Sequence, residues 1–213
     1  MQNIVSYFIH LPLLELIAVF LSLVYVVLAT KGNSWCWSAA FISTALYTFI
    51  FYDVALLMDS MLNIYYMAMA IYGWLSWRKV SPTSMYTYKR ILINSWCWQL
   101  HSKIIVGLAL VSLLLGYLMA NYTNAAFPYI DTATTVFSVF ATYLVAQKVL
   151  ENWLYWLVID FVSIYLYVEK ALQPTAALFM VYVVLALYGY WQWLKQYKAQ
   201  SIVSSPEPLI EVC

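Results

Sequence analysis

The chain has 213 residues, of which 65% are hydrophobic and only 9% are charged, and its formal net charge is +1. A water-soluble domain carries roughly a quarter charged residues, because water must solvate its surface. The composition therefore excludes an ordinary soluble domain, and the near-neutral charge gives no electrostatic basis for binding nucleic acid. Most of the chain is expected to lie in a lipid bilayer, which is then its main partner.

Seven apolar runs are long enough to cross a hydrocarbon layer of about 30 Å as helices. In chain order they cover residues 12–30, 34–52, 55–77, 104–121, 131–147, 152–169 and 174–194. Helix-breaking residues mark several of the boundaries, among them Gly32, Pro128 and Pro174. The sequence predicts an all-α, polytopic membrane protein with seven transmembrane helices.

The basic residues indicate how these helices are oriented. If the loop between the third and fourth helices is cytoplasmic, nine of the ten basic residues lie on the cytoplasmic side, and only Lys170 lies outside. Cytoplasmic loops of membrane proteins are typically rich in lysine and arginine. We therefore expect a multi-pass protein with its N-terminus outside and its C-terminus in the cytoplasm.

The chain contains an internal repeat with a shift of 116 residues. The shift places Trp37 on Trp153, and it places the Tyr-Gly-x-x-x-Trp ending at 72–77 on the same ending at 188–193. Helices one to three thus correspond to helices five to seven, and the fourth helix is a linker. Because a single linker helix restores the original direction, the halves are predicted to be parallel repeats, a plan known among transporters.

The predicted organisation has five parts. They are a first three-helix repeat (1–77), a cytoplasmic loop with an interfacial segment (78–103), the linker helix (104–121), a second three-helix repeat (127–195) and a disordered C-terminal tail (196–213). Trp96 and Trp98 suggest that residues 91–100 lie along the membrane interface, where indole rings are favoured. Pro206 and Pro208 favour disorder in the tail.

Asp160 is the charged residue that most needs an explanation. It lies nine residues into the sixth helix, near the predicted midplane, and no basic residue lies at a comparable depth. A charge at the bilayer centre costs roughly 3 kcal/mol or more, so Asp160 is interpreted as functional. A protonated or hydrogen-bonded structural aspartate is the alternative. Asp131 and Glu151 stand at helix starts and are interpreted as N-terminal caps.

Trp153, Trp156 and Asp160 follow one another at spacings of three and four, which places them on one face of a helix. Two indole rings and a carboxylate suit a flat, positively charged ring, through stacking, cation–π attraction and counter-charge. The further candidates for substrate binding are Asn152 in the same helix, Asn63 and Tyr66 in the third helix, and Tyr182 and Tyr188 in the seventh. Tyrosine also packs between membrane helices, which is the alternative role for the three tyrosines.

The sequence indicates no catalytic or metal site. His10 and His101 lie at the edges of the predicted spans, and the three cysteines fit neither a disulfide framework nor a zinc site. No phosphate-binding loop for ATP is present. We therefore expect a protein that is not an enzyme and that needs no cofactor.

Residues 127–131, 148–156 and 72–77 resemble the PnuC family of bacterial vitamin transporters. The resemblance covers nearly the whole chain, and Glu-Asn-Trp-x-x-Trp at 151–156 is its most specific element. It implies a three-plus-one-plus-three fold related to the SWEET sugar transporters, a homotrimer and a bacterial inner-membrane location. It also implies facilitated diffusion of nicotinamide riboside, which a kinase then traps inside the cell.

One position departs from the nicotinamide riboside members of that family, which carry asparagine where this chain has Asp160. Thiamine, the substrate of another branch, presents a cationic thiazolium and an amino group that a carboxylate can bind. Asp160 therefore favours thiamine, and nicotinamide riboside is the alternative. An alternative of another class is a membrane vitamin-binding subunit without transport of its own. Proton coupling through Asp160 is left open.

Overall fold

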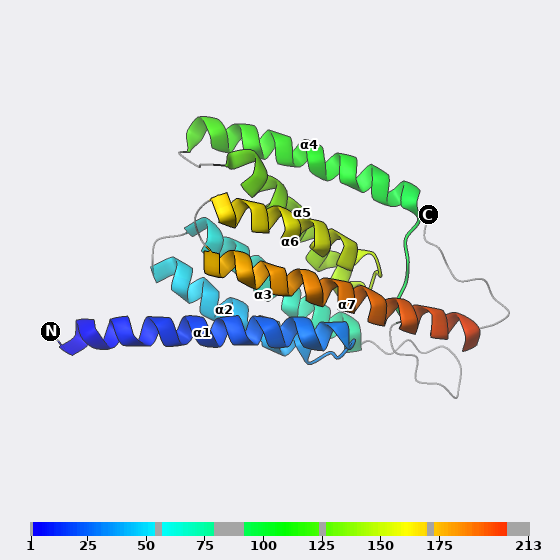
Figure 1. The fold of residues 1–213 in the computed structure, drawn as a ribbon, viewed down its shortest axis with the longest axis horizontal. Coiled ribbons are helices and arrows are strands. Elements are labelled where there is room, and N and C mark those ends of the chain that lie inside the picture. The colour runs from blue at the N-terminus through cyan, green and yellow to red at the C-terminus, as the bar shows by residue number, and fades with distance from the viewer. Residues whose placement is uncertain (1, 54–56, 79–91, 124–126, 170–172, 204–213) are drawn as a thin grey trace. The chain divides into compact units, whose positions relative to one another are not determined.

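The structure, a computed structural model, describes residues 2–53, 57–78, 92–123, 127–169 and 173–203, without the side chains of 2–12, 57–59, 173–175 and 201–203. Apart from one isolated bridge, all regular structure in these ranges is α-helical. The helices are α1 (Gln2–Thr30), α2 (Cys36–Asp53), α3 (Leu57–Arg78), α4 (Trp98–Tyr122), α5 (Pro128–Ala146), α6 (Asn152–Glu169) and α7 (Gln173–Val203) (Figure 1).

Four of these helices are long and apolar enough to cross a membrane on length and composition alone. They contain the segments Leu13–Thr30, Trp98–Tyr122, Pro128–Ala146 and Ala176–Gln200. The remaining helices α2, α3 and α6 have 18, 22 and 18 residues. At 1.5 Å per residue the shorter two still reach about 27 Å, close to the thickness of the hydrocarbon layer. The predicted class of polytopic all-α membrane protein is confirmed.

Three helices extend beyond their predicted apolar runs by six residues or more, and α5 begins three residues before its run. Helix α1 begins at Gln2 instead of residue 12, α4 begins at Trp98 instead of residue 104, and α7 continues to Val203 instead of residue 194. An apolar run marks only the part of a helix inside the hydrocarbon, and the backbone hydrogen bonds continue past it. The predicted disorder of the tail is therefore wrong up to Val203, and the rest of the tail lies outside the described residues.

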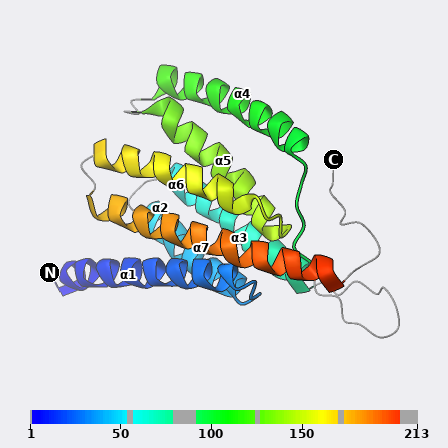
Figure 2. The same ribbon diagram turned by 45° about the vertical axis from the view of Figure 1, so that its right-hand side comes forward.

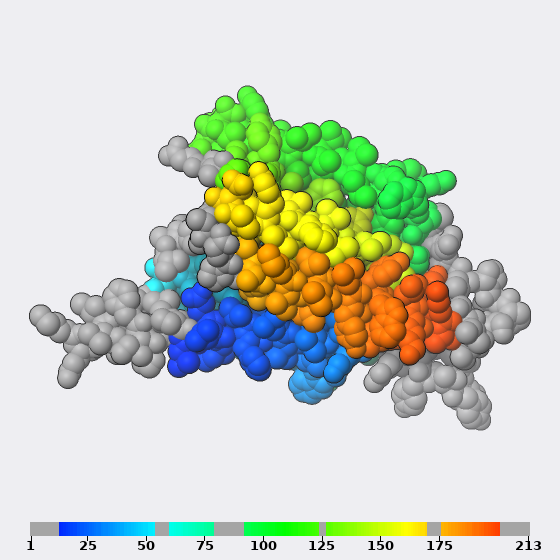
Figure 3. Space-filling view, in the orientation of Figure 1, coloured from blue at the N-terminus to red at the C-terminus, as the bar shows by residue number. Residues whose placement is uncertain are grey.

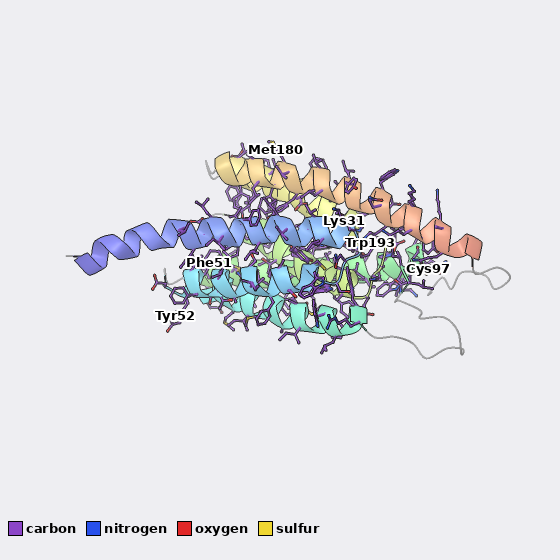
Figure 4. The ribbon with its side chains drawn as sticks, turned by 90° about the horizontal axis from the view of Figure 1, so that it is seen from below. Lys31, Phe51, Tyr52, Cys97, Met180 and Trp193 are labelled. Carbon is purple, nitrogen blue, oxygen red and sulfur yellow. The ribbon has the colours of Figure 1, made fainter. Side chains whose placement is uncertain are left out.

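The chain forms two compact units, Met1–Ile91 and Leu92–Cys213. In the first unit α1 packs on α2, and α2 packs on α3. In the second unit α4, α5, α6 and α7 pack in that order (Figure 2). Helix α4 lies at the outer edge of the second unit, beyond α5 (Figure 3). Within the first unit, Lys31 at the end of α1 lies far from Phe51 and Tyr52 at the end of α2 (Figure 4).

The internal repeat has a direct counterpart in the helix boundaries. Helices α2 and α6 differ by 116 residues at both ends, and α1 and α5 end at Thr30 and Ala146, which are also 116 residues apart. The turns that follow agree as well. Gly32 (φ 64°) and Lys148 (φ 53°) occupy the same place, and they are the positive-φ residues of the described chain. Each half therefore turns from its first to its second helix in the same way.

These turns share one hydrogen-bond pattern at the end of the helix. The paired N–H to C=O bonds run from Gly32 to Ala29 (2.9 Å), Asn33 to Leu28 (3.0 Å), Lys148 to Val145 (3.0 Å) and Val149 to Leu144 (3.0 Å). This is the Schellman motif, in which a left-handed residue lets the chain satisfy the last free carbonyls of a helix. Glycine adopts that conformation without strain, whereas a lysine there strains the backbone.

A tryptophan–glycine–tryptophan contact also recurs in both units. In the first unit the ring of Trp37 lies against Gly73 and meets Trp77 edge-on, with ring centroids 5.4 Å apart at 86°. The second unit repeats the contact with Trp153, Gly189 and Trp193, at 5.5 Å and 90°. A Cβ at either glycine would overlap the tryptophan ring. The residues that reveal the repeat in the sequence are thus those that hold the second helix of each half against the third.

Candidate functional site

Asp160 lies halfway along α6 and is 3% exposed. Among the described residues no hydrogen-bond donor or basic side chain pairs with its carboxylate. It is therefore neither turned toward lipid nor neutralised by a lysine or arginine of the described chain. An intramembrane carboxylate in this situation is typical of a group that binds a ligand or an ion.

Two further side chains lie on the same face of α6 as Asp160. Trp156, one turn earlier, is partly buried and packs against the cluster that contains Leu144 and Ile159. Ser163, one turn later, is buried. The indole ring of Trp156, the carboxylate of Asp160 and the hydroxyl of Ser163 thus follow one another along two turns of α6. Ser163 was not among the predicted site residues, because its only signal in the sequence is its spacing of three residues from Asp160.

Trp153 is placed differently from Trp156. Its side chain is 4% exposed, because the ring lies against Gly189 and the edge of Trp193. Its indole Nε1 is buried and has no hydrogen-bond partner within the described ranges. Trp153 therefore has a packing role that the sequence analysis did not assign, and its stacking on a substrate stays a prediction.

The other α6 and α7 candidates lie at different places in the second unit. Asn152 is fully buried at the start of α6, where its Nδ2 donates a hydrogen bond to the carbonyl of Val149 (2.6 Å). Tyr182 packs edge-on against Phe179 at 5.6 Å. Tyr188 is 42% exposed, and its hydroxyl accepts a hydrogen bond from Gln192 (2.7 Å). Their participation in substrate binding stays a prediction.

Asn63 and Tyr66 belong to α3, in the first unit. Asn63 is buried, and the ring of Tyr66 lies 5.7 Å from that of Tyr65. Their part in a common pocket with α6 also stays a prediction. At the position of the repeat that corresponds to Asp160, the first unit carries Thr44, whose hydroxyl donates to the carbonyl of Ala40 (2.8 Å). The carboxylate is therefore a feature of the second half alone.

A polar cluster at the start of α6 was not expected from the sequence. The carboxylate of Glu151 accepts hydrogen bonds from the hydroxyl of Ser95 and from the backbone N–H of Trp96 (3.3 Å), and it lies 3.7 Å from Nε2 of His101. The other ring nitrogen of His101 is 2.9 Å from the hydroxyl of Tyr155. The side chain of Glu151 therefore binds a distant segment of the chain. Its carbonyl accepts hydrogen bonds from the N–H groups of Leu154 (3.0 Å) and Tyr155 (3.3 Å), so Glu151 occupies the N-cap position of α6, as predicted, while its carboxylate is used elsewhere.

The segment before α4 is held by its backbone as well. The N–H of Asn94 donates to the carbonyl of Lys148 (3.1 Å), and the N–H of Leu150 donates to the carbonyl of Asn94 (2.8 Å). Trp96 packs against the buried cluster, whereas Trp98 is 75% exposed. The predicted interfacial segment is thus partly a packed element of the second unit.

The cap assigned to Asp131, by contrast, is wrong. Helix α5 begins at Pro128, and the residue in the N-cap position is Phe127. Asp131 lies within the first turn, where a negative charge is favoured by the partial positive charge of the helix N-terminus. Proline is well tolerated as the first residue of a helix, which explains why α5 starts three residues earlier than predicted.

The model of a family described as nicotinamide mononucleotide transporter matches residues 12–195 of the chain. The chain belongs to this transporter family. Its relatives in this family include the nicotinamide riboside transporter PnuC of Escherichia coli (strain K12). It is 27% identical over an alignment of 177 residues that covers 72% of this chain and 73% of that protein. The nicotinamide riboside transporter PnuC of Neisseria mucosa is 25% identical over an alignment of 190 residues that covers 83% of this chain and 70% of that protein.

Another relative is the riboflavin/roseoflavin transporter RibM of Streptomyces davaonensis, 23% identical over 185 residues, 86% of this chain and 85% of that protein. The fold is similar to that in the crystal structure of the vitamin B3 transporter PnuC, with a TM-score of 0.71, 22% identity, and coverage of 93% of this chain and 87% of that one. Membership of the PnuC family is thus confirmed. The protein is a membrane transporter for a vitamin and not an enzyme.

The predicted thiamine branch finds no support among these relatives. They are named for nicotinamide riboside or for riboflavin. The preference for thiamine depended on the one position where the chain carries Asp160 instead of asparagine, and one side chain does not define a substrate.

Proposed function

We propose that the protein carries nicotinamide riboside across the bacterial inner membrane by facilitated diffusion. The observation that carries the proposal is the buried carboxylate of Asp160, which has no partner among the described residues and lies one helical turn from the ring of Trp156. The names of two relatives, both nicotinamide riboside transporters, support this choice of substrate.

The chemistry of nicotinamide riboside suits this pair of side chains. Its pyridinium ring is flat and permanently cationic, so it can lie on an indole with a cation–π attraction of about 0.5–2 kcal/mol. The carboxylate supplies the counter-charge and accepts hydrogen bonds from the ribose hydroxyls. Asparagine could also donate a hydrogen bond, which an ionised carboxylate cannot, but hydroxyls act as donors and need only an acceptor.

Thiamine is the second candidate, and Asp160 is the observation that favours it. Its thiazolium is also cationic, and its amino group would donate to the carboxylate. With either substrate bound, the positive ring offsets the negative charge of Asp160, so the occupied site carries a smaller net charge than the empty site. An ion pair crosses a low-dielectric region more easily than either charge alone.

Net uptake needs no energy source within this chain if the substrate is consumed in the cytoplasm. Phosphorylation by a kinase would keep the concentration of the free vitamin low inside the cell, so that net diffusion is inward.

We further propose that the N-terminus lies outside and the C-terminus in the cytoplasm, and that the protein assembles as a homotrimer. Native mass measurement of the purified protein tests the trimer.

The substrate is tested by uptake into liposomes that contain only this protein. We expect saturable entry of labelled nicotinamide riboside down its gradient, with unlabelled nicotinamide riboside as competitor and protein-free liposomes as control. A preference for thiamine would replace the first candidate by the second, and a preference for riboflavin would contradict both. Binding without entry would identify a vitamin-binding subunit instead of a transporter.

A further inference from the structure

An open groove runs between α2 and α3 of the first unit, with a volume of about 310 Å³. Six of the residues that line it are Ser38, Phe41 and Ile42 of α2 and Ile71, Trp74 and Leu75 of α3. All of them except Ser38 are apolar. Ile42, Ile71 and Leu75 are among the exposed hydrophobic residues, so the groove opens on the surface of the first unit. In a membrane span, an open apolar groove of this kind faces the acyl chains of lipids.

One end of the groove carries a positive charge held by aromatic rings. The Cζ atom of Arg78 lies 4.0 Å from the centroid of the Trp74 ring. The ring of Trp35, at the start of the neighbouring helix, meets Trp74 edge-on at 5.3 Å, and Trp35 is exposed. Arg78 is exposed too, and no carboxylate of the described residues pairs with it.

These groups have the chemistry of a lipid headgroup site. Stacking on Trp74 fixes one face of the guanidinium and leaves its N–H donors free, and their fork geometry matches the oxygens of a phosphate. Indole rings are favoured at the level of the lipid headgroups, where the ring is apolar and its N–H can donate. Arg78 ends α3 and Trp35 precedes α2, so both stand at the same end of the two helices that form the groove.

We propose that this groove is a binding site for an anionic phospholipid. One acyl chain lies along the apolar wall formed by α2 and α3, the phosphate binds Arg78, and the N–H of Trp35 donates to an oxygen of the headgroup. A second copy of the chain is the competing occupant. The guanidinium at the mouth of the groove has no carboxylate partner among the described residues, and it favours a phosphate because the interior of a subunit contact would leave that charge without a partner. The site is independent of the transported substrate.

The test is native mass spectrometry of delipidated protein titrated with phosphatidylglycerol and with phosphatidylcholine of the same acyl chains. We expect wild type to prefer phosphatidylglycerol by about fivefold, the effect of one basic residue at a lipid surface. Arg78→Gln should abolish the preference. Lys103→Gln, which removes an exposed charge from α4, is the matched control and should keep it.

A second variant tests the groove itself. Ile71→Trp fills it from an exposed position, so the fold should tolerate the change, and binding of both lipids should fall. The proposal is overturned if Arg78→Gln keeps the wild-type preference, or if Ile71→Trp leaves lipid binding unchanged. If Ile71→Trp leaves lipid binding unchanged but alters the number of subunits, the groove is a contact between copies of the chain.

Discussion

At the scale of single residues, Asp160 has the most unusual environment of the candidate site. Its position in the middle of an apolar run was visible in the sequence, as was the spacing that relates it to Trp156. Its burial and the absence of a cationic partner in the described chain required the structure. Burial and the missing cationic partner matter because an aspartate that is exposed to water or paired with a lysine would gain little from binding a cation.

Replacing Asp160 by asparagine, the residue that the resemblance places here in nicotinamide riboside transporters, should weaken the binding of thiamine, whose thiazolium and amino group both use the carboxylate, more than that of nicotinamide riboside. The change keeps the size of the side chain and removes its negative charge, and truncating one partner of a buried charge pair costs about 2–5 kcal/mol. We expect at least about a tenfold rise in the dissociation constant of thiamine, measured by titration of the purified protein with tryptophan fluorescence as the signal. Glu169→Gln is the control, because Glu169 ends the same helix and is exposed. Equal affinities of Asp160→Asn and wild type would make the carboxylate structural.

At the scale of helices, the boundaries followed from the sequence where a turn contains a strong signal. Gly32 predicted the end of the first helix, and α1 ends two residues before it. The corresponding turn in the second half has Lys148 in the left-handed conformation, and nothing in a lysine predicts that. Asn94, which is distant in sequence, donates its N–H to the carbonyl of Lys148 and accepts the N–H of Leu150, so the geometry of this turn comes from tertiary contacts.

The packing of the second helix of each half on the third depends on a glycine. Gly73→Ala and Gly189→Ala should each destabilise the protein by about 1–3 kcal/mol, because the added methyl group would overlap a tryptophan ring. Gly107→Ala in α4 is the matched control. A Cβ there meets nothing within 4 Å, and alanine favours a helix, so stability should rise by up to about 1 kcal/mol. Thermal unfolding in detergent measures all three, and a lower midpoint for Gly107→Ala alone would contradict the packing argument.

At the scale of the whole molecule, the chain joins residues that are far apart in sequence. Glu151 binds Ser95 and Trp96, which lie more than fifty residues earlier. This contact fastens the segment before α4 to the turn between α5 and α6, so the linker helix is part of the second unit. Sequence spacing carries no signal for such a contact.

Glu151→Ala should loosen this segment. It leaves the hydroxyl of Ser95 and the amide of Trp96 without their acceptor, at a cost of about 1–3 kcal/mol. We expect faster hydrogen exchange at residues 92–97 and a lower unfolding midpoint. Ser95→Ala added to Glu151→Ala should cost less than the sum of the two single changes, because both remove one interaction. Additive effects would show that the two side chains act separately.

The sequence by itself determined the class of protein, the number of helices, the repeat and the family. These follow from apolar runs, from the 116-residue shift and from the motif at 151–156, because the bilayer imposes one rule on every span. Only the tertiary structure decided that Trp153 is a packing residue, that Glu151 binds a distant segment, and that Asp160 is buried without a partner in the part of the chain that the structure describes. A helical face is defined by local spacing, but what that face meets depends on helices that the chain brings together from elsewhere.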